Sequence, residues 1–253
     1  MISKEALRKL LLVLMTMALA GCANIYEQNL FENFDGPPSA AELSNGSAGD
    51  IAEAAQSPQF LQELRRDPDA KRRIQDRLKS IYRSDTASEE ERRQAAAVSA
   101  EIELETTSGG KIVNNVVDVL LESDDGGDFS NPSTLVRNIL PDSIRGDREA
   151  LTEQIRSFQE AADAYDGYGT DLDAGDTPEG GNDGEGAQRA TVAVIMDDLA
   201  RQSSPEQLAE DIQNDNLDGY SDPTENTVGD AENPTPFRNI LDAGGLTSVV
   251  DRS

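Results

Sequence analysis

The sequence offers almost none of the histidine and cysteine side chains that commonly act as bases and nucleophiles near neutral pH. The 253 residues include no histidine and a single cysteine, Cys22. Pairs of serine or cysteine with histidine are therefore excluded, as are the usual histidine and cysteine zinc sites. Because 49 residues are acidic, no carboxylate pair stands out as the acid and base of a hydrolase. We assign no catalytic residue and expect no enzyme; a carboxylate-dependent hydrolase is the least favoured alternative.

Oxygen-bearing side chains recur at alternate positions between residues 214 and 225. The spacing resembles an EF-hand calcium loop, which has oxygen ligands at positions 1, 3, 5, 9 and 12, glycine at 6 and a backbone carbonyl at 7. Position 1 is Asn214 rather than aspartate, and Pro223 disfavours a helix beginning inside the loop. The simpler interpretation is a solvated acidic linker, and Ca²⁺ is the one cofactor the sequence suggests. The candidate ligands are Asn214, Asn216, Asp218, Tyr220, Asp222 and Glu225.

The N-terminal residues have the pattern of an export signal. Basic residues up to Lys9 precede an uninterrupted apolar run over residues 10–18, which ends in small residues before Cys22. The run is shorter than the roughly 20 apolar residues that cross a bilayer. A basic start, a short apolar core and small residues are typical of a secretory signal peptide.

The last residues of this signal, Leu19-Ala20-Gly21-Cys22, resemble the lipobox of bacterial lipoproteins. The resemblance implies that Cys22 carries a diacylglyceryl group, that cleavage follows Gly21, and that the new amino group is acylated, for example with palmitate. Ala23 is not the aspartate that retains enterobacterial lipoproteins at the inner membrane, so the resemblance favours the outer membrane where the bacterium has one. The alternative is an ordinary secreted protein with a free thiol at Cys22.

The composition limits the partners of the mature chain. Residues 1–21 carry three basic side chains and one acidic, so their removal takes the net charge from −27 to −29. Nucleic acid is excluded as a partner because binding to phosphates requires the opposite sign. An anionic membrane surface would also repel this charge, so membrane attachment is expected through the lipid on Cys22, with several acyl chains holding the protein stably. The expected partner is another envelope protein.

Beyond residue 50 the apolar residues recur at the spacing of amphipathic helices. Capping residues followed by proline mark several helix starts, and Ser88 with Glu91 and Ser204 with Gln207 fit capping boxes. The apolar stripes are Ile74, Leu78, Ile81, Tyr82; Leu151, Ile155, Phe158, Ala162, Tyr165; and Val192, Ile195, Met196, Leu199. The cap and proline pairs are Ser57-Pro58, Asp67-Pro68, Asn131-Pro132, Ser204-Pro205 and Asn233-Pro234. The predicted helices span residues 48–55, 58–65, 68–83, 88–106, 110–122, 132–140, 148–166, 187–202, 205–214 and 234–250, the last broken at Gly244-Gly245.

Two features leave alternatives open. The β-branched content of residues 112–121 suits a strand, but apolar pairs at i and i+4 favour a helix. The four-residue run Arg-Asn-Ile-Leu occurs at residues 137–140 and again at 238–241, each after an Asn-Pro pair. This repeated run would fit a duplication of the two halves of the chain, although two copies do not establish a repeat period.

The sequence therefore predicts an all-α fold, an irregular bundle or solenoid of roughly 8–10 amphipathic helices with acidic disordered loops. The pairs Arg72-Arg73 and Arg92-Arg93 are interpreted as solvated helix faces. The expected function is a lipid-anchored envelope protein, facing the periplasm or the cell exterior, that binds another protein without catalysis; a calcium-binding module is the alternative. The predicted regions are a signal peptide (1–21), the lipidated cysteine and a tether (22–50), a helical region (51–166), an acidic glycine-rich insertion (167–186) and a second helical region (187–253) packed on the first as one domain.

Overall fold

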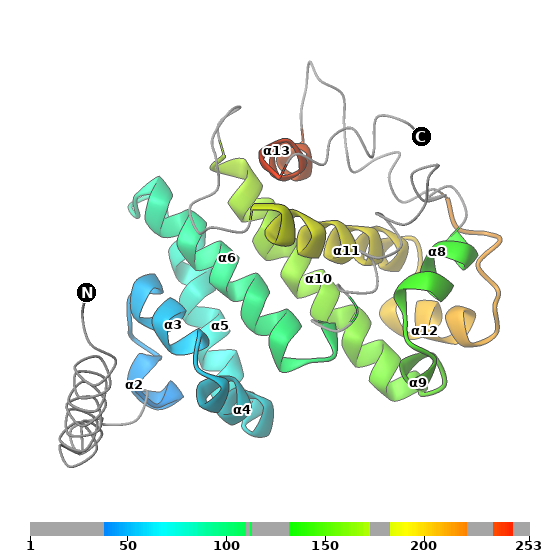
Figure 1. Ribbon diagram of the computed structural model, residues 1–253, viewed down its shortest axis with the longest axis horizontal. Coiled ribbons are helices and arrows are strands. Elements are labelled where there is room, and N and C mark those ends of the chain that lie inside the picture. The colour runs from blue at the N-terminus through cyan, green and yellow to red at the C-terminus, as the bar shows by residue number, and fades with distance from the viewer. Residues whose placement is uncertain (1–37, 110–111, 113–131, 173–182, 222–234, 245–253) are drawn as a thin grey trace, which may run out of the picture. The chain divides into compact units, whose positions relative to one another are not determined.

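The computed structural model describes residues 38–109, 112, 132–172, 183–221 and 235–244. In these residues the regular secondary structure is entirely helical, which confirms the predicted all-α fold (Figure 1). From Ser39 onward the described residues belong to one compact unit. The described helices are α2 (Ala40–Leu43), α3 (Ala48–Ala55), α4 (Pro58–Arg66), α5 (Pro68–Tyr82), α6 (Glu89–Thr106), α8 (Pro132–Ile139), α9 (Asp142–Arg145), α10 (Arg148–Thr170), α11 (Asp183–Arg201), α12 (Pro205–Gln213) and α13 (Pro236–Ala243).

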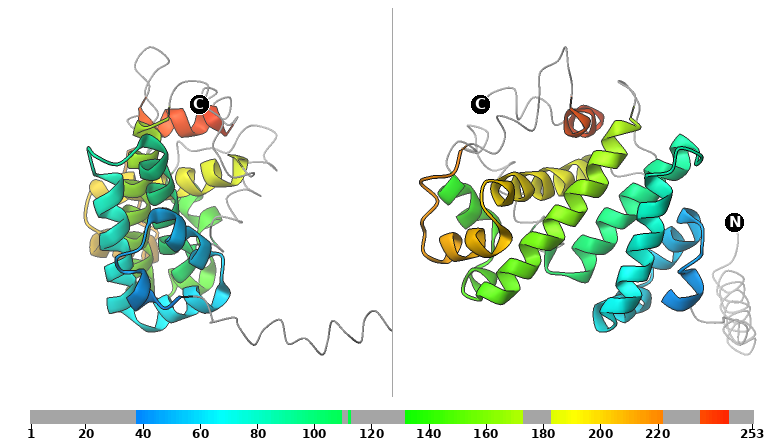
Figure 2. Two further views of the ribbon diagram at one scale, coloured as in Figure 1. Left: turned by 90° about the vertical axis from the view of Figure 1, so that its left-hand side faces the viewer. Right: turned by 180° about the vertical axis from the view of Figure 1, so that it is seen from behind.

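Helices α6 and α10 form the centre of the bundle and lie side by side (Figures 1 and 2). Helix α6 also contacts α3, α4 and α5, whereas α10 contacts α11, α12 and α13. Because neighbours cover α6 on several sides, it is buried around most of its circumference. Small residues on α6, including Ala95, Ala96 and Ala100, are fully buried and let neighbouring helices approach closely. The remaining helices are thus arranged around this central pair.

The predicted apolar stripes are confirmed as the core faces of α5, α10 and α11. Every residue of the three stripes is buried. Burial of a side chain such as Leu78 or Phe158, both fully inaccessible, stabilises the fold by about 1.5–3 kcal/mol relative to leaving it exposed. The core is aliphatic and alanine-rich, with Phe60 and Phe158 as its largest fully buried side chains.

Helix starts follow the predicted caps in part. The Asp67 carboxylate accepts the Asp69 and Ala70 N–H groups at the start of α5, and the hydroxyls of Ser88 and Ser204 accept N–H groups three residues on. The predicted start at Pro234 is wrong, because α13 begins at Pro236. Thr235 supplies the cap there by accepting the Arg238 N–H group at 3.2 Å.

The predicted tether is shorter than expected at its C-terminal end. Helices α2 and α3 begin within residues 22–50. Each has a capping box that the sequence interpretation missed, Ser39 with Glu42 and Ser47 with Asp50. Leu43 is buried, and α2 packs against α4 and α5. These residues belong to the bundle because their caps are satisfied locally and their apolar side chains meet neighbouring helices.

The predicted insertion over residues 167–186 also differs from the structure at both ends. Helix α10 continues through Thr170, and α11 begins at Asp183. Tyr168 packs against the core, and Gly169 is buried. A Cβ on Gly169 would lie 2.0 Å from the Pro236 carbonyl oxygen of α13. Glycine here permits a close helix contact, whereas the sequence interpretation took it as a sign of a loop.

The structure describes three smaller features of the sequence in part. Of the ambiguous stretch, only Ile112 is described, and it is buried; the rest lies outside the described residues. The short helix α9 was not predicted. The repeated Arg-Asn-Ile-Leu run lies at the end of α8 but near the start of α13, so its two copies occupy different helical positions.

Arg92 corrects the expectation of a solvated helix face. Its guanidinium makes two hydrogen bonds to the Asp171 carboxylate, at 2.8 and 2.7 Å, and its side chain is 20% exposed. The pair joins the start of α6 to the C-terminal end of α10. Arg72, by contrast, pairs only with the exposed Asp69 on its own helix. The same residue type therefore has a bundle-joining role at one position and a surface role at the other.

Candidate functional site

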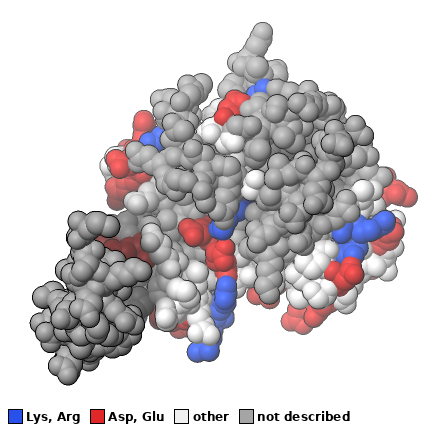
Figure 3. Space-filling view, in the orientation of Figure 1, with Lys and Arg blue, Asp and Glu red and all other residues white. Residues whose placement is uncertain are grey.

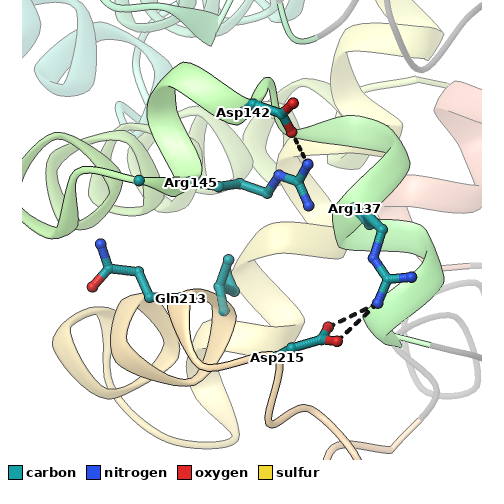
Figure 4. A pocket seen from close by; sticks show the side chains of 7 residues that line it. Arg137, Asp142, Arg145, Gln213 and Asp215 are labelled. Atoms are coloured by element: carbon teal, nitrogen blue, oxygen red, sulfur yellow. Dashed lines mark hydrogen bonds and ion pairs between the residues drawn. The ribbon is translucent and has the colours of Figure 1, made fainter.

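A polar pocket of about 500 Å³ lies between α8, α9 and the C-terminal end of α12. The consecutive short helices α8 and α9 meet the later helix α12 at this pocket. Figure 4 shows Arg137 and Arg145 reaching it from α8 and α9. Helix α9 packs against α10 and α12, and these contacts fix the position of α9 beside the pocket. The pocket is lined by Arg137, Asp142, Arg145, Gly146, Ile212, Gln213 and Asp215.

Arg137 and Asp215 close one side of the pocket. The Nη2 group of Arg137 donates hydrogen bonds to both carboxylate oxygens of Asp215, at 2.9 and 3.0 Å. Asp215 lies two residues after the last residue of α12 and has a positive φ of 53°, a conformation that aspartate tolerates better than most residues. Because the backbone of Asp215 is left-handed, the helix cannot continue through it, and the chain turns away from the axis of α12 there.

Arg145 forms the other side of the pocket. Its Nη2 donates to the Asp142 carboxylate one turn earlier on α9 (Figure 4), and its side chain is 27% exposed. The Nε–H group of Arg145 is buried and has no hydrogen-bond partner among the described residues. A buried donor without a partner costs about 1–3 kcal/mol, so an acceptor that reaches this group would relieve that cost.

A second hollow of about 570 Å³ lies along the exposed face of α10. Its lining includes Arg148 and Arg156, which reach across to α12. Arg148 pairs with Glu210 at 2.9 Å, and Arg156 pairs with Glu206. These pairs tie α12 to α10 and leave Glu149 and Glu153 as further acidic groups in the hollow. The surface beside the pocket thus carries several carboxylates.

A deeply buried charged pair lies elsewhere, between α5 and α6. Lys71 donates to the Glu103 carboxylate at 2.5 Å, with 21% and 10% of the two side chains exposed. Burial raises the pKa of Glu103, and the attraction of Lys71 offsets part of that rise. Ser157 of α10 donates to the Glu103 carbonyl at 3.0 Å. Because Glu103 lines neither described pocket, we interpret this pair as a structural link between three helices.

The described part of the predicted calcium loop folds back onto α12. Asn214 is the C-cap of α12. The Asn216 N–H donates to the Asp211 carbonyl at 2.8 Å, and the Tyr220 hydroxyl donates to the Asp211 carboxylate at 2.8 Å. Tyr220 was predicted to offer its carbonyl, whereas the structure engages its hydroxyl. Asp211 was not singled out in the sequence, and its only signal is its place one turn before the loop.

Calcium binding at this loop stays a prediction. Asp222 and Glu225 lie outside the described residues, and Asp218 is exposed beside Gly219. Within the described residues, no group of three or more histidine, cysteine, aspartate or glutamate side chains could hold a metal ion. A calcium titration followed by thermal unfolding would test the loop as a whole.

Sequence reasoning also missed the arginines of the pocket. Arg137 and Asp215 are 78 residues apart, so their pairing has no local signal. Asp142 and Arg145 do have one, because oppositely charged residues three positions apart on a helix face one another. Their spacing could have suggested α9, although not the pocket that it borders.

The comparisons with known proteins leave the site to be interpreted from its own chemistry. The chain matches no protein-family model, no curated protein and no solved structure. Cys22 lies outside the described residues. Among the helices that the structure describes, none combines the length and apolar character needed to cross a membrane.

Proposed function

We propose that this protein is a lipid-anchored protein of the bacterial cell envelope that binds another protein without catalysing a reaction. The lipid is carried by Cys22, and the helical bundle faces the periplasm or the cell exterior. The outer membrane is the favoured location in a bacterium that has one. The partner binds at the pocket between α8, α9 and α12.

The buried Nε–H group of Arg145, which lacks a partner, carries this proposal. A backbone carbonyl or carboxylate of a partner segment could accept a hydrogen bond from it once the Arg145 side chain turns this group toward the open pocket. The Asp142 and Asp215 carboxylates already pair with Arg145 and Arg137, so the pocket is nearly neutral. The surrounding acidic surface and the net charge of the chain, −27 before cleavage, favour a segment that also carries basic side chains.

The pocket lining favours binding over catalysis. Its described residues supply two guanidiniums, two carboxylates and one amide, and none supplies a hydroxyl, thiol or imidazole. Guanidiniums are permanently charged near neutral pH and serve as hydrogen-bond donors rather than as bases. A set of donors and acceptors of this kind suits recognition of a polar segment.

Site-specific photo-crosslinking in intact cells tests the partner. A photoreactive residue at Gln213, an exposed position that lines the pocket, should give a crosslinked product in the otherwise unchanged protein. Arg145→Gln should abolish that product because it removes the free donor, while Arg201→Gln, at a 71% exposed position on α11, should leave it unchanged. Equal crosslinking in all three proteins would contradict the proposal, and circular dichroism would check that each variant folds.

Mass spectrometry of the membrane-extracted protein tests the lipid. The expected product begins at Cys22 and carries two or three acyl chains, which is enough for stable attachment. Cys22→Ser should be left uncut at this site and should move to the soluble fraction after cell lysis. A Cys22→Ser protein that is still cut after Gly21 and still sediments with membranes would disprove lipid attachment at this residue.

A further inference from the structure

Basic residues gather at one part of this otherwise acidic chain. Residues 65–83 contain eight basic and three acidic side chains, whereas the whole chain contains 22 basic and 49 acidic. The segment is therefore locally positive by five charges in a protein whose net charge is −27. Figure 3 shows Lys and Arg side chains at the lower edge of the molecule, over the region of α4.

The connection between α4 and α5 places these residues at a corner. Asp67 alone separates the two helices, serving as the C-cap of α4 and the N-cap of α5. Its carboxylate accepts the N–H groups of Asp69 and Ala70 at 3.0 and 2.9 Å, and Pro68 occupies the first position of α5. The end of α4 and the first turns of α5 are thereby held together. We call their four exposed arginines the basic corner: Arg65, Arg66, Arg72 and Arg73.

The charge of the basic corner is only partly compensated. Arg66 and Arg73 make no ion pair or hydrogen bond with any described residue. Arg72 pairs with Asp69, although both side chains are at least 70% exposed, and Arg65 donates from Nε to the Glu105 carbonyl at 3.0 Å. Such exposed contacts are weak and readily exchanged for others. By contrast, Arg137, Arg148 and Arg156 pair with carboxylates outside their own helices.

The basic corner lies beside the point where the chain joins the bundle. The Ala40 N–H at the start of α2 donates to the Glu63 carboxylate of α4 at 3.2 Å, one turn before Arg66. Helix α2 also packs against α5. Cys22 precedes Ser39 by 17 residues, which span at most about 60 Å when fully extended. A lipid on Cys22 would therefore keep this side of the bundle within reach of the membrane.

We propose that the basic corner binds the anionic headgroups of the membrane that holds the protein. This inference rests on the proposed lipid at Cys22, which raises the local concentration of headgroups beside the corner. At physiological ionic strength the Debye length is about 8 Å, so acidic groups farther away are screened. The local excess of arginine then decides the contact, despite the net charge of the whole chain. Arginine suits this role because its planar guanidinium binds phosphate through two parallel hydrogen bonds.

Energy transfer from the bundle to labelled headgroups measures the contact. The full-length lipidated protein is purified from membranes and reconstituted into vesicles of phosphatidylcholine alone or with added phosphatidylglycerol. A donor dye is placed on Gln62→Cys, an exposed position on α4, because acylation blocks Cys22. A second preparation carries the dye on Gln213→Cys, an exposed position that lines the pocket at the end of α12. Phosphatidylglycerol should increase transfer from the α4 label more than from the α12 label.

Matched variants separate the corner from net charge. Arg66→Glu with Arg73→Glu should remove the increase, as should about 1 M NaCl, where the Debye length falls to about 3 Å. Arg148→Glu with Arg156→Glu changes the net charge equally on the exposed face of α10 and should preserve the increase. Circular dichroism would check that both double variants fold.

The possible outcomes are distinct. Equal transfer in the two kinds of vesicle, or an increase that survives the corner variant, would overturn the headgroup contact. Binding of a polyglutamate peptide that depends on Arg66 and Arg73, without a response to phosphatidylglycerol, would assign the corner to an acidic protein and would also overturn it. Failure of the lipid proposal would be visible separately, because unlipidated protein has no acyl mass and does not incorporate into either vesicle.

Discussion

At the scale of single residues, burial changes what a charged side chain does in this protein. Glu103 and Asp197 are both nearly inaccessible, and burial raises the pKa of each carboxyl against the attraction of Lys71 or Arg201. Asp163 behaves differently. Burial would raise its pKa, but hydrogen bonding and attraction from Lys79 with support from Tyr82 lower it overall. The ionised form of a buried carboxylate such as Asp163 is therefore favoured only where several partners converge on it.

The raised pKa of Glu103 predicts a pH dependence of stability. An unfolded glutamate loses its proton near pH 4.3, whereas the folded protein holds that proton to a higher pH. Between these two values the folded state binds more protons, so the contribution of Glu103 to stability is greatest at low pH and declines as the pH rises. Urea unfolding from pH 4 to 8 should show a less negative slope of stability against pH in Glu103→Gln.

The matched control for this measurement is Glu153→Gln, at an exposed position on α10. Its stability should change with pH in parallel with that of the unaltered protein. If the stability of Glu103→Gln and of Glu153→Gln changed with pH in the same way, the burial of Glu103 would have no effect on its titration in the folded state.

At the scale of elements, the docking of α13 depends on one glycine of α10. A Cβ at position 169 would lie 2.0 Å from a backbone oxygen of Pro236 and 2.5 Å from its carbonyl carbon. Because these are backbone atoms, no side-chain rotation could relieve the clash. Asn239 reinforces the contact by donating its side-chain amide to the Gly169 carbonyl at 3.0 Å. The helix contact and its hydrogen bond would therefore be disturbed together.

Gly169→Ala should displace α13 while the rest of the bundle stays folded. Hydrogen exchange should accelerate at the α13 amides, and the bundle should unfold at a lower urea concentration. The control is Gly186→Ala on α11, where an added Cβ meets no atom within 4 Å; alanine there should stabilise the helix by about 0.5–1 kcal/mol. Unchanged exchange at α13 in Gly169→Ala would show that the contact is not close in solution.

At the scale of the whole molecule, charge repulsion opposes folding. Even if every one of the 22 basic residues paired with an acidic one, 27 of the 49 carboxylates would lack a partner. The described ion pairs that join different helices, such as Arg92–Asp171 and Arg148–Glu210, offset this repulsion only locally. We therefore expect repulsion to outweigh attraction in the response to salt.

Raising NaCl from about 0.01 to 0.15 M shortens the Debye length from about 30 to 8 Å and should raise the thermal unfolding midpoint. Glu149→Lys with Glu153→Lys, both at exposed positions, makes the net charge four units less negative and should reduce this salt response. Calorimetry at several NaCl concentrations would measure both effects. A midpoint that falls as salt is added would mean that the ion pairs between helices dominate.

Much of the fold could be predicted because its signals are local. The spacing of Ile74, Leu78 and Ile81 indicates a helix face through the helical period alone, and a cap such as Asp67 satisfies N–H groups within three residues. The candidate site had no such signal. Arg137 and Asp215 meet across 78 residues of chain, and the free donor of Arg145 depends on what surrounds it.

The sequence by itself determined that the chain lacks the residues for histidine-based catalysis, that its described part is helical, and which helix faces form the core. Composition and helical periodicity suffice for these because they need no knowledge of distant segments. Only the tertiary structure decided that residues 39–50 join the bundle, that Gly169 belongs to a helix contact, and that Arg92 bonds to Asp171. Each depends on which surfaces meet when the chain folds, and the free energy of such contacts comes from neighbours that local sequence does not specify.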